Sequence, residues 1–532
     1  MKTTLQVMGL VIAGLSFSQA AAQAPVLGSS ATFALFSTNG AVSNTGFSLL
    51  TGNVGTNNGS STNFGNVDGV MHDSDGTTAL AAADLTIAYN QLEAAVPDFF
   101  PAALLGNGQT LVAGTYFIGE SASLSNTLIL DGENDPNAVF IFKIQGAFSS
   151  AAASQVLLTN GALACNVFWK IEGLVDLATN TSIKGTIIAN NAAVILNTGV
   201  TLEGRAFSTT GAVTVSGVTV TTPLGCSTLP LTGPVQPVLN TVACFTVFSG
   251  NGEVANTGIT FITGDVGTNV GLTTGFQTEN VTGTIHPNPD VATAQCAADL
   301  NTVYTYLQTV PVDIQLLYPA QFGNDLVLTP HTYLLSGATV LPTVLQLNAQ
   351  GTADAVFVIK INGAFSTGTY AEVELINGAQ AKNVFWKVDG AVNLNDYTAF
   401  AGTLIGNNGA MILNTGVSID GRALSTSGGI STFGINAVST GGCTFLATPA
   451  LEIKSKVEVY PNPFRDVINV ESEAVLAANT VIVIYNSTGA VVATNKLGGT
   501  LSTLAISLPN GLYFYKIMTD GKMVKSGKLI AK

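Results

Sequence analysis

Charged residues are scarce in this chain of 532 residues. They make up 9% of the sequence, and hydrophobic residues make up 47%, whereas about 25% of the residues of a soluble protein are usually charged. No uncharged apolar run beyond the N-terminus reaches the roughly 18 residues that a membrane helix needs. The sequence therefore predicts a soluble protein with a surface of Thr, Ser, Asn, Gly and Ala, in which something other than charge limits association.

Basic residues are fewer than acidic ones. The chain has 18 Lys and Arg against 32 Asp and Glu, a net charge of −14. This balance disfavours binding to nucleic acid, and no basic patch with interleaved aromatic residues occurs. We therefore expect no nucleic-acid partner.

Residue types that bind metals or carry out catalysis are also few. The three histidines, His72, His286 and His331, lack HxxxH or any other ligand spacing. Asp73-Ser-Asp75-Gly resembles the start of a calcium loop, but the remaining ligand positions are missing. There is no Ser/His/Asp arrangement and no phosphate-binding loop. We therefore expect neither a metal nor a cofactor.

Cysteine usage fits a protein that leaves the cytoplasm. Residues 1–22 have the charge, apolar core and small cleavage residues of a secretory signal, so a structural disulfide is permitted. Cys226 and Cys443 lie at equivalent ends of a repeat described below. Because the five cysteines are an odd number, no pairs are assigned. Cys296 lies on the apolar face of a helical pattern and is expected to be a buried free thiol.

One long stretch of the sequence occurs twice. Residues 185–211 read GTIIANNAAVILNTGVTLEGRAFSTTG, residues 402–428 read GTLIGNNGAMILNTGVSIDGRALSTSG, and eighteen of the 27 positions are identical. A repeat at this distance indicates two copies of one domain rather than an array of short repeats. We expect copy one at 23–226 and copy two at 240–445.

Within each copy the pattern predicts short strands and one helix. Alternating β-type residues broken by Gly and Asn-Gly turns predict strands, which recur roughly every 17–20 residues, enough for one coil of a three-sided β-solenoid. The polar region 58–76 is expected to be a loop or capping segment. A helix is expected over Ala79–Val96, ended by Pro97. Its apolar stripe is Leu85, Tyr89, Leu92 and Val96, matched in copy two by Leu300, Tyr304 and Leu307.

Several charged residues recur between the copies and raise the question of catalysis. One interpretation is a site of carboxylates and cations, as in β-helical polysaccharide lyases. The other, which we favour, is that Glu203-Gly-Arg205 and Lys170-Ile-Glu172 form ion pairs at the edges of turns. Trp169 is expected in the core rather than as a sugar-binding platform, and so is Trp386. We therefore expect no enzyme.

The motif Asn-Thr-Gly-x-Thr/Ser occurs four times, at 44–48, 197–201, 256–260 and 414–418, and residues 178–181 extend it. Asn and Gly tolerate positive φ, so the motif is partly turn chemistry. Turn chemistry accounts neither for the Thr nor for the missing charge.

A physical function accounts for both. Rungs of a β-solenoid stack about 4.8 Å apart, and β-branched Thr is stiff at χ1, so a Thr ladder holds methyl and hydroxyl groups in a rigid grid. Such a grid can order water at a spacing close to that of ice. Because each contact is weak, binding must be multivalent, and two linked copies add avidity.

Taken together, these features resemble a known family. FALFS…NTG…TGNVGTN, the single helix, NVFWK and ILNTGVT-x-x-GRA are similar to the microbial ice-binding proteins over about 28–220 and 240–440. The resemblance implies a right-handed, three-faced, discontinuous β-solenoid whose first rung packs beside its last, bringing Thr45 near Thr198 and Thr257 near Thr415. Some members carry Thr-Ala/Gly-x-Thr/Asn on the ice-binding face. The expected ice-binding residues, from the motif and from this resemblance, are Thr45, Ser48, Thr179, Thr181, Thr198, Thr201, Thr257, Thr260, Thr415 and Ser418. Residues 395–397 break the pattern that copy one has at 178–180, so copy two is expected to be less flat.

The end of the chain has a different character. After a linker expected at 446–456, alternation within residues 457–532 predicts a small antiparallel β-sandwich. Tyr460-Pro-Asn-Pro-Phe464, Gly511-Leu-Tyr513-Phe and the terminal Gly527-Lys528-Leu-Ile resemble the sorting domain of type IX secretion. That resemblance implies export across the outer membrane by the secretion machinery, with the tail removed or exchanged for an anchor at the cell surface.

The sequence thus predicts a mainly β protein with two right-handed β-solenoid domains, each with one flanking α-helix, and a small C-terminal β-sandwich. The expected function is that of a secreted or surface-attached, monomeric, non-enzymatic ice-binding (antifreeze) protein that limits ice growth or recrystallisation. Two alternatives stay open. One is a cell-surface adhesin or glycan-binding module on the same scaffold, and the other is a polysaccharide-degrading enzyme, which the few basic residues and the absence of a carboxylate cluster disfavour.

Overall fold

The computed structural model describes residues 22–226, 231–439, 457–477, 479–486, 488–519 and 522–532. The predicted signal segment up to residue 21, Cys443 and the predicted linker lie outside the described residues. The described residues belong to two compact units, within Met1–Cys443 and within Thr444–Lys532. We call residues 22–226 solenoid 1, residues 231–439 solenoid 2 and residues 457–532 the tail.

Each solenoid has three faces of parallel strands, A, B and C, which the chain visits in that order as it coils. In solenoid 1, face A consists of β6 (Met71–Asp73), β4 (Asn53–Thr56), β1 (Phe33–Ser37), the second halves of β19 (Thr201–Ser208) and β17 (Ser182–Ala189), β15 (Val167–Ile171), β12 (Phe140–Ile144) and β9 (Gly114–Ile118). Face B consists of β5 (Ser61–Thr62), β2 (Val42–Thr45), β20 (Val213–Ser216), β18 (Val194–Leu196), β16 (Val175–Leu177), β13 (Phe148–Ser150), β10 (Ala122–Ser125) and β7 (Leu104–Gly106). Face C consists of β3 (Leu49–Thr51), β21 (Thr219–Thr221), the first halves of β19 and β17, β14 (Gln155–Thr159), β11 (Thr127–Asp131) and β8 (Gln109–Val112).

Solenoid 2 repeats this plan. Its face A consists of β28 (Ile285–His286), β25 (Asp265–Thr268), β22 (Phe245–Ser249), the second halves of β41 (Ser418–Ser425) and β39 (Ala399–Gly406), β37 (Val384–Val388), β34 (Phe357–Ile361), β31 (Thr332–Leu335) and β29 (Ile314–Leu316). Face B consists of β26 (Thr273–Thr274), β23 (Val254–Thr257), β42 (Ile430–Phe433), β40 (Met411–Leu413), β38 (Val392–Leu394), β35 (Phe365–Thr367) and β32 (Thr339–Leu341). Face C consists of β27 (Val281–Thr282), β24 (Phe261–Thr263), β43 (Asn436–Val438), the first halves of β41 and β39, β36 (Glu372–Ile376), β33 (Val344–Asn348) and β30 (Leu326–Leu328).

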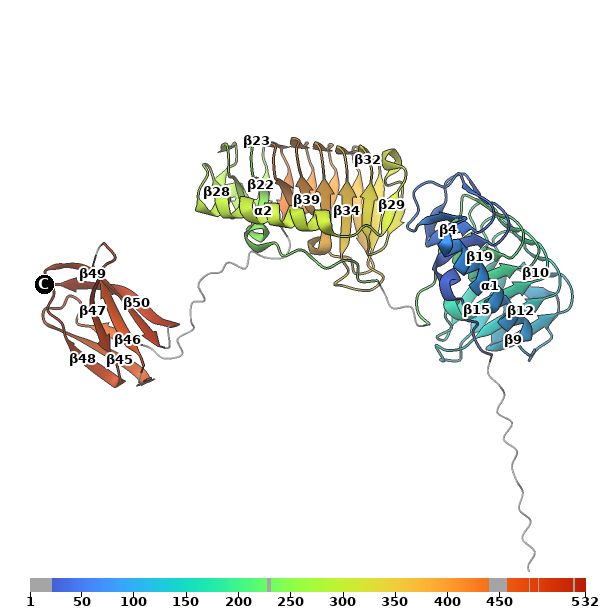
Figure 1. Cartoon of the computed structure of the whole chain (residues 1–532), viewed down its shortest axis with the longest axis horizontal. Helices are drawn as coiled ribbons and strands as arrows, with labels where there is room; N and C mark the ends of the chain where they lie inside the picture. Colours follow the sequence, from blue (N-terminus) through green and yellow to red (C-terminus); the bar gives the residue numbers. More distant parts are fainter. Residues whose placement is uncertain (1–21, 227–230, 440–456, 478, 487, 520–521) are drawn as a thin grey trace, which may run out of the picture. The chain divides into compact units, whose positions relative to one another are not determined.

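The stacking order is discontinuous, as the resemblance implies. In solenoid 1 the first rung pairs with the last on all three faces, through Leu35 with Ala206, Ser43 with Thr214, and Leu49 with Thr219. Helix α1 (Gly76–Ala94) connects β6 at one end of the stack with β7 at the other. Helix α2 (Val291–Thr309) does the same in solenoid 2, where it runs along the strands from β28 to β29 (Figure 1).

Stacked glycines explain part of the repeated stretch. Strands β17 and β19 each cross from face C to face A, and Gly185 and Gly204 are paired at the crossing. Gly185 has a positive φ of 105°, and a Cβ on Gly204 would lie 1.9 Å from the Gly185 carbonyl oxygen. Two rungs can therefore turn the corner at this spacing only if Gly stands at both positions.

Helix α1 begins earlier and ends earlier than predicted. Asp75 caps α1 through a capping box with Thr78, and the helix ends at Ala94. Leu85 and Leu92 are buried, as predicted. The prediction that Val96 belongs to the apolar stripe is wrong, because Val96 lies beyond the helix end and is 79% exposed.

The solenoid cores are apolar and contain the tryptophans. In solenoid 1, Trp169 is fully buried and stacks on Phe142 with 4.1 Å between ring centroids. Its indole N–H donates to the carbonyl of Lys184 at 2.9 Å. Trp386 is likewise fully buried in solenoid 2. The prediction of a core role for both tryptophans is confirmed.

The structure contains disulfides, as the expected export of the protein permits. A disulfide joins Cys165 to Cys226, and Cys244 is also disulfide-bonded. Cys296 on α2 is a free, fully buried thiol, which confirms that prediction.

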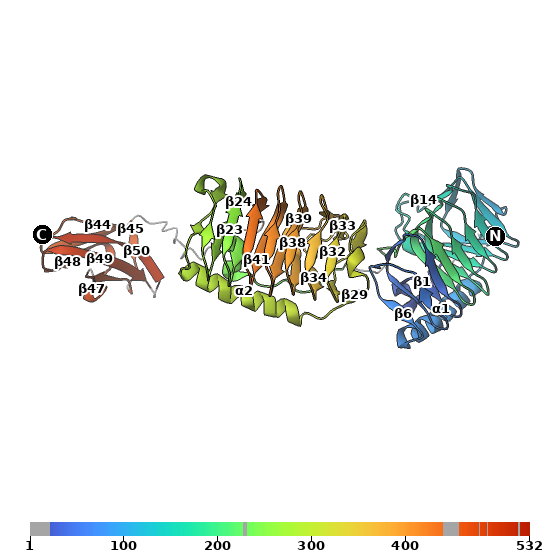
Figure 2. The same cartoon turned by 90° about the horizontal axis from the view of Figure 1, so that it is seen from above.

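The tail consists of two antiparallel sheets (Figure 2). One contains β44 (Val457–Tyr460), β45 (Val467–Leu476) and β48 (Gly499–Ala505), and the other contains β47 (Val491–Lys496), β46 (Val481–Tyr485), β49 (Gly511–Thr519) and β50 (Lys522–Ala531). Val470 and Leu504 of the first sheet and Ile484 and Ile517 of the second belong to one core, as expected for a β-sandwich.

Within the described part of the chain, no helix is both long and apolar enough to cross a membrane.

Candidate functional site

Face A of each solenoid is covered by its helix. In solenoid 1, Leu85 and Leu92 of α1 share one apolar cluster with Phe36, Phe168 and Phe207 of face A. Lys143 anchors the end of the helix by donating to the carbonyls of Glu93 and Ala95 at 2.6 and 2.9 Å. A helix held in this way covers the central strands of face A.

The charged groups that recur between the copies also hold the helix. Lys170 is buried and pairs with Glu172, as predicted, and also with Glu93 of α1. Glu172 accepts hydrogen bonds from Tyr89 at 2.6 Å and from Asn190 at 2.7 Å. Burial and the hydrogen bond to Glu172 raise the pKa of Tyr89 to about 12. This cluster joins the helix to face A, and its charged groups are paired with one another. We therefore interpret it as structural.

The predicted pair between Glu203 and Arg205 is wrong. Glu203 instead pairs with Lys184 of the neighbouring rung at 2.8 Å on face C. Arg205 is buried on the outer side of face A, where its Nε donates to the carbonyl of Ala31 at 2.8 Å. The two residues are paired with different partners because the strand crosses from face C to face A between them.

Face B of solenoid 2 carries an uninterrupted, uncharged ladder of side chains. Along each of its strands, buried apolar residues alternate with residues that point outward, such as Met411, Ile412 and Leu413. The central outward residues of successive strands are direct neighbours in register. They are Thr274, Ala255, Ser431, Ile412, Asn393, Ser366 and Val340. Their side chains form a regular row of hydroxyl, methyl, aliphatic and amide groups.

Face B of solenoid 1 carries the corresponding ladder with one charge in it. Its central outward residues are Thr62, Ser43, Thr214, Ile195, Asp176, Ser149, Ser123 and Leu104. Asp176 occupies the position of Asn393 in solenoid 2. Its carboxylate accepts from the Asn197 amide at 2.8 Å, as Asn393 accepts from Asn414 at 2.8 Å. The two faces therefore have the same geometry at this rung but differ in charge.

The sequence reasoning missed these central ladders. The available signal was the alternation in short segments such as VTVS and VIL, repeated at the spacing of a rung. The Asn-Thr-Gly motif is the stronger repeat in the sequence, and it predicted a site at the corner between faces B and C instead.

Seven of the ten predicted ice-binding residues are exposed and three are buried. The exposed ones are Thr45, Thr179, Thr198, Thr201, Thr257, Thr415 and Ser418, and the buried ones are Ser48, Thr181 and Thr260. A buried side chain has no access to ice, so the prediction is wrong for these three.

Each buried hydroxyl closes a turn instead. Ser48 donates to the Asn44 side chain at 2.7 Å and accepts from the Val218 amide. Thr260 does the same with Asn256 at 2.6 Å. Thr181 bonds to Ser150 and to the Ala178 carbonyl at 2.7 and 2.8 Å.

The exposed residues lie on two different surfaces. Thr45 ends a face B strand and is paired with Ser216, whose hydroxyl is 3.3 Å from that of Thr198, so one strand separates Thr45 from Thr198. In solenoid 2, Phe433 stands between Thr257 and the turn that contains Thr415. Thr201 and Ser418 instead begin strands on face C.

The irregular segment of solenoid 2 carries exposed aromatic residues at the corner between faces B and C. Tyr397 stacks on Tyr370 of the preceding rung, with 5.0 Å between ring centroids and 8° between ring planes. Both have positive φ and are exposed. Solenoid 1 has Asn180 and Ala153 at these positions, so its corner is smoother.

No group of three or more His, Cys, Asp or Glu suited to hold a metal ion occurs among the residues that the structure describes. The histidines before the helices have another role. His72 and His286 hydrogen-bond through Nδ1 to the helix-capping Asp75 and Asp290, both at 2.6 Å.

Two family models match the chain. One, described as ice-binding-like, matches residues 36–221 and again residues 248–438. The other, described as a secretion system C-terminal sorting domain, matches residues 458–532.

Several proteins are similar to the two solenoids. An ice-binding protein of Nostoc sp. (strain HG1) is 37% identical over 221 residues, which are 41% of this chain and 80% of the relative. An ice-binding protein of Colwellia sp. is 33% identical over 235 residues, 41% of this chain and 90% of the relative. The crystal structure of an ice-binding protein from an Antarctic Flavobacteriaceae bacterium is 70% identical, with a TM-score of 0.79 over 80% of this chain and 100% of that chain.

Proposed function

The chain belongs to the ice-binding-like family, which it contains in two tandem copies, and from this premise we propose that it adsorbs to ice through face B of each solenoid. The observation that carries the proposal is the row of outward residues on face B. In solenoid 2 it runs over seven strands without a charge. Face A is covered by a helix, and face C carries ion pairs such as Lys184 with Glu203.

The physical basis is a rigid array that matches ordered water. Parallel strands hold the outward side chains about 4.8 Å apart along the stack. Each outward residue is fixed from below by buried neighbours, so little side-chain entropy is lost on binding. A surface without charges lacks strongly bound water that would compete with the ice lattice. The adsorption needs no catalytic group, and we propose a non-enzymatic protein.

The tail supports export. The sorting domain at 458–532 places the chain among proteins of type IX secretion, so the protein is secreted or attached to the cell surface. We propose domain limits of 23–226, 240–445 and 457–532, after a signal peptide at 1–22 and with a linker at 446–456. We further propose that the protein acts as a monomer and that the tail is either removed or exchanged for a surface anchor.

The proposal is tested by placing a charge at the centre of face B. Ile412 and Ile195 occupy central positions of the two ladders. We expect Ile412→Lys to reduce ice-crystal shaping and recrystallisation inhibition strongly, Ile195→Lys to reduce them less because Asp176 already interrupts that ladder, and the double variant to abolish them. The reason is that a lysine holds its own hydration shell and lifts the face away from the lattice.

Matched controls lie on face C. Val438 is 38% exposed, the same fraction as Ile412, so Val438→Lys adds the same charge at the same exposure on another face. Leu157→Lys is the counterpart of Ile195→Lys. The controls should keep wild-type activity, and all variants should keep the wild-type melting temperature. If wild-type protein leaves ice crystals round and freely growing, ice binding is refuted and the glycan-binding alternative takes its place.

A further inference from the structure

A short segment of solenoid 1 divides its side chains between two cores. Residues 66–70 run beside β3 and β4, where Asp68 forms a parallel bridge with Thr51 and the Val54 amide donates to the Val70 carbonyl. Val67 points into the core of solenoid 1. Its neighbours at alternate positions, Asn66, Asp68 and Val70, contact solenoid 2. This alternation is what an extended strand produces between two bodies.

Asp68 is the centre of the contact. Its side chain is 3% exposed, and its carboxylate accepts hydrogen bonds from the Tyr333 hydroxyl at 2.5 Å, the Thr329 hydroxyl at 2.8 Å and the Thr329 amide at 3.2 Å. Burial raises the pKa of Asp68, and His331 and these hydrogen bonds oppose that rise. A buried carboxylate is costly unless it is fully hydrogen-bonded. The burial of Asp68 therefore depends on the hydrogen bonds from Thr329 and Tyr333.

Two neighbours extend the contact. The Asn66 amide group donates to the Tyr318 carbonyl at 2.9 Å and accepts from the Tyr318 amide at 2.9 Å. This pairing involves the turn at Pro319–Gln321 of solenoid 2. Val70 packs against the apolar core of solenoid 2.

Some residues of this contact differ between the two copies. Asp68 and Val70 correspond to Thr282 and Thr284 in solenoid 2, both exposed to solvent. On the receiving side, Tyr333 corresponds to Tyr116, and both donate to a carbonyl four residues earlier at 2.6 Å. Thr329, however, corresponds to Val112, which has no hydroxyl to offer. Only solenoid 1 therefore has the full set of residues that reach across, Asn66, Asp68 and Val70. Only solenoid 2 has the full set that bonds to Asp68, namely Thr329 and Tyr333.

We infer that Asn66, Asp68 and Val70 form a copy-specific lock that docks solenoid 1 onto the rungs that follow helix α2 in solenoid 2 and makes the tandem one rigid body. This inference goes beyond the proposed function, since it concerns how the two copies are joined. A contact of this head-to-tail kind could in principle continue into a filament. It stops at two copies because solenoid 2 presents Thr282 and Thr284 where a further lock would need Asp and Val, a polar cap of the kind that ends repeat proteins.

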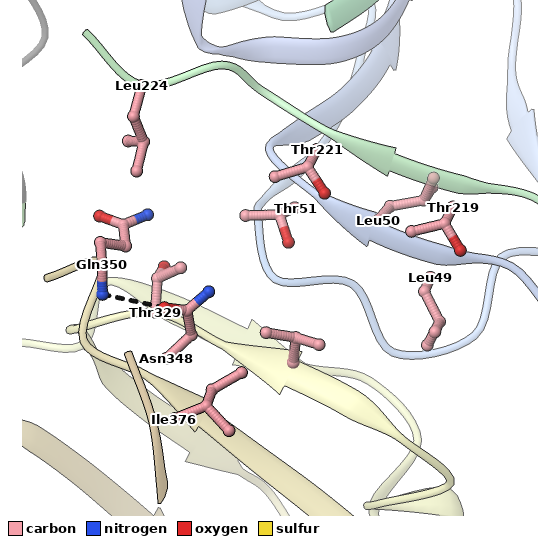
Figure 3. Close-up of a pocket in the computed structure, with 11 residues that line it drawn as sticks. Leu49, Leu50, Thr51, Thr219, Thr221, Leu224, Thr329, Asn348, Gln350 and Ile376 are labelled. Carbon is pink, nitrogen blue, oxygen red and sulfur yellow. Dashed lines mark hydrogen bonds between the residues drawn. The ribbon is translucent and has the colours of Figure 1, made fainter. Parts of the chain in front are cut away.

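The rest of the interface is loosely packed. A cleft of about 170 Å³ lies beside the lock, with Thr329 in its wall. Figure 3 shows Leu49, Thr51 and Thr221 of solenoid 1 across this cleft from Asn348 and Ile376 of solenoid 2. Because a cleft separates the solenoids beside the lock, we expect the hydrogen bonds of the lock to decide whether the solenoids stay docked.

The lock is tested on the full chain by Asp68→Ala and Tyr333→Phe. Either variant leaves buried polar groups without their partner, so we expect the solenoids to undock. Small-angle X-ray scattering should then show a wider distribution of interatomic distances. Hydrogen exchange at the Thr329 amide, which the Asp68 carboxylate protects in the wild type, should become at least tenfold faster.

Two controls match these variants. Tyr116→Phe removes the same hydrogen bond within solenoid 1 without touching the lock, and Thr282→Ala alters the position that corresponds to Asp68. Both should scatter like the wild type and keep wild-type exchange at Thr329. Wild-type scattering and wild-type exchange in both Asp68→Ala and Tyr333→Phe would overturn the lock. Neither measurement uses ice, so this result is separate from a failure of ice binding.

Discussion

At the scale of single residues, the two copies differ in charge at the centre of face B, where solenoid 1 has Asp176 and solenoid 2 has Asn393. Both lie at the same rung of face B and both accept from an asparagine amide at 2.8 Å. The local geometry is therefore conserved while the charge changes. If face B works by ordering water, this one charge should matter more than charges elsewhere on the protein.

Exchanging these residues tests that expectation. Asp176→Asn should lower the concentration needed to inhibit recrystallisation, and Asn393→Asp should raise it, because an ionised carboxylate keeps a hydration shell that does not fit the ice lattice. We expect shifts of roughly two- to tenfold, or about 0.4–1.4 kcal/mol. The measurement is a dilution series in a recrystallisation assay.

A charge-matched control separates the face from net charge. Asp131→Asn removes the same charge from face C, where Asp131 lies on β11. It should leave the inhibitory concentration unchanged. An improvement with Asp131→Asn as large as that with Asp176→Asn would mean that total charge, and not face B, sets the activity.

At the scale of elements, the corner glycines of β17 and β19 set how closely two rungs can stack. Gly204→Ala would place a Cβ 1.9 Å from the Gly185 carbonyl oxygen, so the rungs would have to separate. We expect the free energy of unfolding of solenoid 1 to fall by about 2–4 kcal/mol, measured as a lower melting temperature by calorimetry. Gly76→Ala is the control, because a Cβ there meets nothing within 4 Å. Equal melting temperatures for the two variants would contradict this account.

The elements were predictable from the sequence to the extent that their signals are local or repeated. The duplication, the two helices, the buried tryptophans and the small β-sandwich follow from periodicity and from comparison of the copies. The corner turns show the limit. The same Asn-Thr-Gly-x-Thr/Ser motif buries its last residue at Ser48 and Thr260 and exposes it at Thr201 and Ser418, because the strand after the turn enters face C one residue later in the first pair. Sequence letters alone do not show that offset.

The lock between the solenoids was not predictable from one copy. Residues 58–76 were expected to be a loop or capping segment, yet they contain β5, β6 and the segment that contacts solenoid 2. Their polar composition has no period strong enough to reveal buried contacts. The available signal was divergence between the copies: Asp68 against Thr282, and Thr329 against Val112, are chemical changes within an otherwise similar stretch.

At the scale of the whole molecule, adsorption and export belong to separate units. The two solenoids lie within one compact unit, and the tail is another with its own core of Val470, Ile484 and Ile517. Since the candidate ice-binding faces lie wholly within the first unit, we expect binding not to need the tail. Since the sorting-domain match lies wholly within the second, we expect sorting not to need the solenoids.

Truncation therefore should separate the two functions. A chain ending at residue 445 should shape ice as the full chain does when purified, because both faces B are complete. In the native host it should accumulate inside the outer membrane, which is measured by comparing cell fractions with the culture medium. In the reciprocal experiment, an unrelated protein carrying the signal segment at its start and residues 446–532 at its end should appear outside the cell. Release of the truncated chain in wild-type amounts would show that the export information lies in the solenoids, and loss of ice shaping in the purified truncated chain would show that the tail takes part in binding.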